Sequence, residues 1–178
     1  MRKILFIIIS LLITASVRAQ IQRSFWGCTL NVSRRNVIHQ NLTSYGFTMV
    51  SSHDYHDGTI AYNYKQSNGN LIQFEGLGWD YLVMTEYNGI LFEVTLQMST
   101  ATYSLEMLSR NHNYIISELR SKYNSYYLTE LSDGKPFTFG AMDKETTCVT
   151  SNQLCNGIRT VYLQYVDTKT YSIWNSRN

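Results

Sequence analysis

Apolar and polar residues alternate most regularly in the middle of the chain, where turn pairs separate successive runs. Residues 60–64, 81–87 and 90–98 alternate with a period of two, which predicts strands with one face on the core. Asn68-Gly69 and Asn88-Gly89 follow two of these runs. Because both central residues of a type I′ turn need positive φ, these pairs predict tight hairpins. Residues 60–98 are therefore expected to form antiparallel strands.

Two segments instead show helical spacing. Residues 34–45 carry apolar side chains on one face, with Ser33 as the expected N-cap and Gly46 where a helix needs a left-handed residue. Residues 102–123 predict a second helix. Its apolar stripe steps by three and four residues and comprises Leu105, Leu108, His112, Ile115, Leu119 and Tyr123.

Shorter runs complete the predicted order of elements. Further strands are expected at residues 24–27, 71–75, 126–131, 137–141, 158–166 and 171–174, with a turn at Asp133-Gly134. Strands joined by tight turns pair antiparallel, and helices pack on one face of such a sheet. The prediction is an α+β fold, an antiparallel sheet with two helices packed on one face. Residues 20–178 would form a single domain, with 20–98 and 99–178 as candidate halves of helix plus strands.

The first residues predict export. Arg2 and Lys3 precede an apolar run at residues 4–15, and small side chains follow at residues 17–19. This order is typical of a secretory signal peptide, and the run is shorter than the roughly 20 residues that a membrane span requires. Residues 1–19 are therefore interpreted as a signal peptide. The mature protein would begin at Gln20, be periplasmic or secreted, and have no transmembrane anchor.

Charge and aromatic content narrow the kind of partner. Cleavage removes three of 15 basic residues and none of 13 acidic ones, so the net charge changes from +2 to −1. Such a balance gives no electrostatic basis for binding nucleic acid. All 14 tyrosines lie in the mature chain. Tyrosine offers a large contact area with few rotors, so the sheet face opposite the helices is a candidate binding surface. Its expected members are Tyr81, Tyr87, Tyr162 and Tyr165.

The three cysteines, Cys28, Cys148 and Cys155, all survive cleavage. They allow three single pairings. A hairpin with its turn near Ser151-Asn152 would bring Cys148 and Cys155 together, and an oxidising compartment would let them form a disulfide. Cys28 has no adjacent activating partner, so it is interpreted as a buried free thiol.

Two local clusters carry candidate chemistry. His53 and His56 lie with two aspartates inside residues 53–57, a composition that can ligate zinc, although the same residues suit an ordinary loop. Glu86 and Glu93 flank a predicted hairpin, and paired carboxylates can hydrolyse glycosides. Both acids alternate with apolar neighbours, which indicates a solvated sheet face. We therefore assign no catalytic residue, no metal ligand and no cofactor.

The opening of the mature chain resembles that of small exported proteins of unknown function from Bacteroides-like bacteria. The resemblance is carried by Phe25-Trp26-Gly27, Leu30, Ser33, Val37, Leu42 and Gly46-Phe47. The same stretch is similar to BamE-like and β-lactamase-inhibitor-like modules. The resemblance implies a small helix-and-sheet module that binds other molecules rather than transforming them.

These observations together favour a non-enzymatic, exported binding protein whose partner is another protein. One alternative is a carbohydrate-binding module, which requires Trp79 or Trp174 to be exposed and coplanar with a neighbouring ring. A second alternative is a small metal-dependent hydrolase centred on His53 and His56, which requires a further ligand in a pocket.

Overall fold

The computed structural model describes residues 20–123, 126–129 and 138–176. The predicted signal peptide and the predicted turn at Asp133-Gly134 lie outside these residues. No helix in the described ranges is long and apolar enough to cross a membrane.

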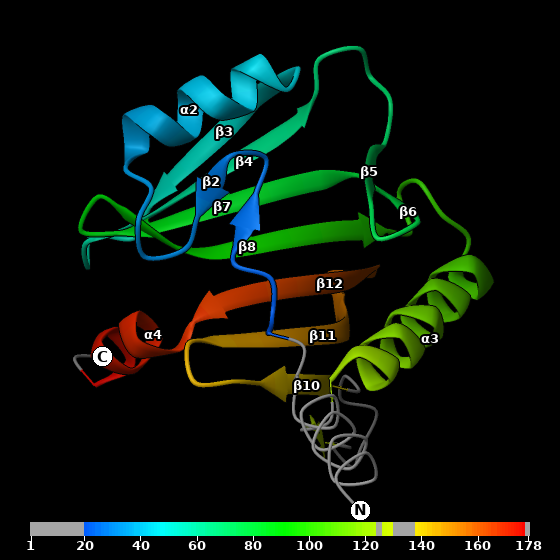
Figure 1. The fold of residues 1–178 in the computed structure, drawn as a ribbon. Helices are drawn as coiled ribbons and strands as arrows, with labels where there is room; N and C mark the ends of the chain where they lie inside the picture. The colour runs from blue at the N-terminus through cyan, green and yellow to red at the C-terminus, as the bar shows by residue number, and fades with distance from the viewer. Residues whose placement is uncertain (1–19, 124–125, 130–137, 177–178) are drawn as a thin grey trace, which may run out of the picture.

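The predicted α+β class and antiparallel sheet are confirmed. Eight strands form one sheet in the order β3-β4-β7-β8-β12-β11-β10-β9, with every neighbouring pair antiparallel (Figure 1). The first four in chain order are β3 (Phe47–Asp54), β4 (Thr59–Gln66), β7 (Tyr81–Tyr87) and β8 (Ile90–Ser99). The others are β9 (Tyr126–Thr129), β10 (Thr138–Met142), β11 (Thr146–Cys155) and β12 (Ile158–Asp167).

The topology repeats along the chain. Helix α2 (Arg35–Ser44) precedes β3, β4, β7 and β8, and helix α3 (Leu105–Lys122) precedes β9 to β12. The last strand of each set, β8 and β12, pair at the centre of the sheet. Figure 1 shows α2 beside the first set of strands and α3 beside the second.

One face of the sheet carries the main core. Two small hairpins add to the layer that α2 and α3 form on this face. One pairs β1 (Ser24–Phe25) with β2 (Cys28–Thr29), and the other pairs β5 (Ile72–Phe74) with β6 (Leu77–Trp79). A single apolar cluster joins Ile38 and Leu42 of α2, Leu108 and Leu119 of α3, and Leu96 of the sheet. Two helices therefore pack on one face, as the sequence predicts.

Local signals explain most element boundaries. The Ser104 hydroxyl caps α3 by accepting a hydrogen bond from the Met107 amide, and acidic and basic residues lie in its first and last turns respectively. The expected cap of α2 is wrong, because Arg34 is its N-cap and Ser33 Oγ accepts from the Thr29 amide instead. Gly46 follows α2 with φ +79°, as predicted.

Two elements differ from the predicted pattern. Residues 47–54 form the edge strand β3, so His53 and Asp54 belong to a strand rather than to a loop. Residues 171–174, predicted as a strand, lie in helix α4 (Thr168–Asn175). The Asp167 carboxylate accepts from the Thr170 amide, and this cap begins the helix.

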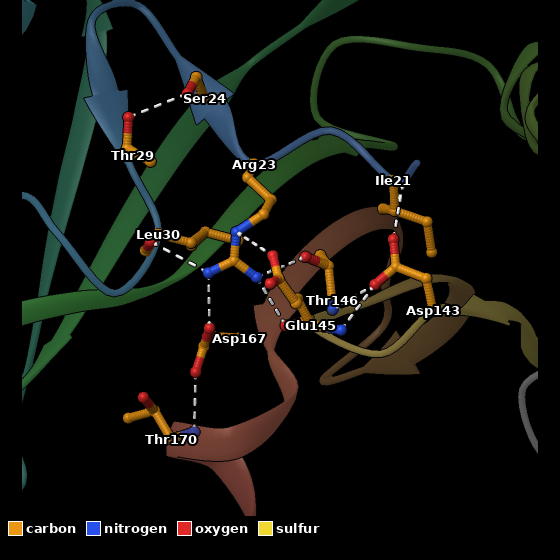
Figure 2. Close-up of polar contacts among 10 residues, drawn as sticks. All are labelled: Ile21, Arg23, Ser24, Thr29, Leu30, Asp143, Glu145, Thr146, Asp167 and Thr170. Carbon is orange, nitrogen blue, oxygen red and sulfur yellow. Dashed lines mark hydrogen bonds and ion pairs between the residues drawn. The ribbon is translucent and has the colours of Figure 1, made fainter. Parts of the chain in front are cut away.

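An arginine ties the start of the described chain to α4 (Figure 2). Arg23 donates from Nη2 to Asp167 Oδ2 at 2.8 Å and from Nη1 to the Glu145 carbonyl at 2.8 Å. Nearby, the Ile21 amide donates to the Asp143 carboxylate. The segment before β1 therefore fixes the N-terminus of α4 and the turn between β10 and β11.

Candidate functional site: a hollow in the open sheet face

The face opposite α2 and α3 is hollowed at its centre. Residues of five neighbouring strands and one loop enclose a hollow of about 270 Å³. Its lining is mostly amide and hydroxyl side chains and comprises Tyr55, Ala61, Val83, Thr85, Glu93, Thr95, Gln97, Ser151, Gln153, Tyr162 and Gln164. Thr85 and Thr95 are each only 6% exposed.

Strand alternation accounts for which side chains reach the hollow. Leu96 and Leu163 point into the core, and their neighbours Gln97 and Tyr162 point to the other face. The pairing of β12 with β8 places Tyr162 opposite Gln97 and Gln164 opposite Thr95. The hollow is therefore centred on the pair of strands at which the two sets meet.

Glu93 is the acidic residue of the lining. Its Oε1 accepts hydrogen bonds from Thr95 Oγ1 at 3.0 Å and from Thr85 Oγ1 at 3.4 Å, and the Gln164 side chain also hydrogen-bonds the carboxylate. Burial raises the pKa of Glu93 above its ordinary value, although these three hydrogen bonds oppose the rise. None of the ion pairs found among the described residues involves Glu93.

A bulge separates Glu93 from the other acid of the hairpin. The register of β7 with β8 shifts between Thr85 and Glu86, so that Thr85 pairs with Glu93 but Glu86 pairs with Leu91. Glu86 consequently lies on the helix-covered face, only 1% exposed, in an ion pair with Arg35. The expectation of a shared solvated face is wrong, and the sheet separates the two carboxylates.

The predicted tyrosine surface is only partly assembled. Tyr162 lines the hollow, and Tyr81 lies on the same face with the Lys65 ammonium 4.3 Å from its ring centre. Tyr87 is buried against Phe92, in a cluster that Trp174 of α4 joins. The placement of Tyr165 is wrong, because it is 2% exposed within the main core.

The requirements of the two alternative functions are not met by the residues named for them. Trp79 is fully buried in the core, and the half-buried Trp174 ring is tilted by 39° from the Tyr171 ring beside it rather than coplanar with it. The His53 ring packs against Tyr55, while His56 contacts Asp54. The described part of the chain contains no group of three or more His, Cys, Asp or Glu side chains that could hold a metal ion.

The predicted disulfide is also corrected. Cys148 and Cys155 both lie on β11, which runs through Ser151-Asn152 without a turn. Seven residues of extended strand span about 23 Å, well beyond the roughly 7 Å that a disulfide tolerates. Cys148 is a free, fully buried thiol, and so is Cys28, as the sequence predicts.

Comparisons of the chain with family models, with curated proteins and with solved structures found no match. The resemblance to exported helix-and-sheet modules therefore stays a prediction. The sequence does not reveal the hollow, because the hollow depends on the pairing of β8 with β12 and on the bulge that turns Glu93 and Glu86 to opposite faces.

Proposed function

We propose that this chain is an exported protein that acts by binding a partner protein through the hollow in its open sheet face. The observation that carries the proposal is the hollow's position and lining. It crosses five strands on the face that α2 and α3 leave uncovered, and it presents hydrogen-bonding side chains around a half-buried carboxyl group.

The chemistry of the lining supports recognition more than catalysis. The Ser151 hydroxyl accepts from the Gln153 amide at 3.3 Å, and an amide cannot act as the base that would activate a serine. Glutamine, threonine and tyrosine offer directional hydrogen bonds on a rigid sheet. A concave polar surface of this kind suits a protruding segment of a partner protein.

A matched pair of variants tests the proposal. Gln97→Trp fills the hollow, whereas Gln73→Trp makes the same change at an exposed position of β5. Tagged protein produced from the full chain would be incubated with exported and envelope fractions of the source organism, and captured proteins identified by mass spectrometry. We expect a discrete partner with the wild type and Gln73→Trp, and its loss with Gln97→Trp. Equal capture by all three would contradict the proposal.

A further inference from the structure

The Glu93 carboxyl group in the hollow is half-buried and has three uncharged hydrogen-bond donors. Thr85 and Thr95 donate to the same oxygen, Oε1, and Gln164 hydrogen-bonds the carboxylate. Neutral donors offset only part of the cost of removing a carboxylate from water, and a cation offsets more of it. Elsewhere in the described chain, the buried acids Glu86 and Asp167 each have an arginine partner.

We propose that the hollow receives a basic side chain of the partner protein, a lysine ammonium or an arginine guanidinium, with Glu93 as its counter-ion. This inference rests on the proposed function, because it names the group that the hollow recognises.

The charges around the site favour a cation. Glu93, Tyr55 and Tyr162 are the titratable residues that line the hollow, so no lining side chain is positive at neutral pH. Lys65, a basic residue on the same face, is engaged with the Tyr81 ring. A cleft whose lining carries charge of one sign attracts groups of the opposite sign.

The size and lining suit one side chain. Sites for drug-sized ligands usually enclose about 300–1,000 Å³, and the hollow of about 270 Å³ lies just below that range. The side-chain carbonyls of Gln97 and Gln153 can accept N–H groups that Glu93 does not reach. The rings of Tyr55 and Tyr162 offer faces for a cation. A basic residue on a protruding loop therefore fits the site better than a whole small molecule.

The test selects short random peptides displayed on phage against the wild-type protein. Peptides would be retained only if Gln97→Trp abolishes their binding and Gln73→Trp does not. We expect the retained peptides to share a lysine or arginine. Glu93→Gln should weaken them about thirtyfold or more, because removing one member of a desolvated charge pair typically costs at least that much.

A double-mutant cycle then isolates the pair. Replacing the shared basic residue of the peptide by norleucine or citrulline should weaken binding to the wild type but scarcely change binding to Glu93→Gln. A second variant, Gln164→Lys, supplies an ammonium beside Glu93 and should block the same peptides, whereas Gln73→Lys should not. Circular dichroism and thermal unfolding would check that each variant folds.

The outcomes separate the inference from the proposed function. Retained peptides that lack a shared basic residue, or that bind Glu93→Gln as tightly as the wild type, would overturn the inference and leave the binding function standing. If no peptide depends on the open hollow, the proposed function fails and the inference fails with it.

Discussion

Glu93 is an acid whose ionisation is unfavourable in the folded protein. Burial raises the pKa of its carboxyl, so the folded state favours the protonated form relative to the unfolded chain. Stability contributed by Glu93 is therefore greatest below its ordinary pKa of 4.5 and is lost as the pH rises through the higher pKa of the folded state. Near neutral pH this preference for the protonated form lowers the stability of the folded state relative to the unfolded chain.

Glu93→Gln should consequently raise the free energy of unfolding at pH 7, because it removes the charge and keeps the shape. The difference from the wild type should shrink as the pH falls below 4.5. Urea unfolding at both pH values measures this, with Glu106→Gln at an exposed position of α3 as the control. A loss of stability at pH 7 would mean that Glu93 serves the fold instead.

The two thiols make a second prediction at this scale. Burial raises the pKa of Cys28 to about 11 and raises that of Cys148 further. Since the thiolate is the reactive form, both should react slowly with iodoacetamide in the native protein and rapidly in denaturant. Mass spectrometry of the labelled peptides reads out each site separately. Rapid native labelling of Cys148 would contradict its burial in β11.

Among the elements, α4 is positioned by one ion pair. Burial alone would raise the pKa of Asp167, but the Thr170 amide and the Arg23 guanidinium outweigh it and hold the pKa below its ordinary value. The stability that this carboxylate contributes is therefore present above the pKa of the unfolded state, about 3.9, and is lost as the pH falls through the lower pKa of the folded state.

Arg23→Met should destabilise the protein by about 3 kcal/mol, because it leaves the buried Asp167 carboxylate without its cation. It should also move acid unfolding to higher pH. Arg110→Met is the matched control, because it breaks an exposed pair with Glu106 that is worth less than about 0.5 kcal/mol. Chemical unfolding compares the two, and equal effects would show that the Arg23 pair does not hold α4 in place.

The elements also show what a sequence pattern can predict. Strands β7 and β8 follow from strict alternation around an Asn-Gly turn, and α3 follows from its apolar stripe and Ser104 cap. Strand β3 does not follow from its sequence pattern, because an edge strand with seven exposed residues has no alternating core face. Helix α4 is mistaken for a strand because no turn separates it from β12. Its capping residue, Asp167, is also the last residue of β12.

At the scale of the whole molecule, the hollow depends on both sets of strands. Thr85 and Glu93 come from the first set, and Ser151 and Gln164 come from the second. They meet because β8 and β12 pair over 160–166. No local pattern encodes this meeting, so the sequence alone predicts the proposed binding face only in outline, through Tyr81 and Tyr162.

The most direct test of the account places a photo-reactive benzophenone amino acid at Gln97, in the hollow, or at Gln73, on β5, in protein made by the source organism. With the probe at position 97, irradiation should crosslink the protein to a discrete partner. The crosslinked segment of that partner should lie next to a lysine or arginine. With the probe at position 73, no such product should form. The claim that the hollow is the binding site would be contradicted if both positions gave the same product. It would also be contradicted if position 97 gave no product while other surface positions captured a partner.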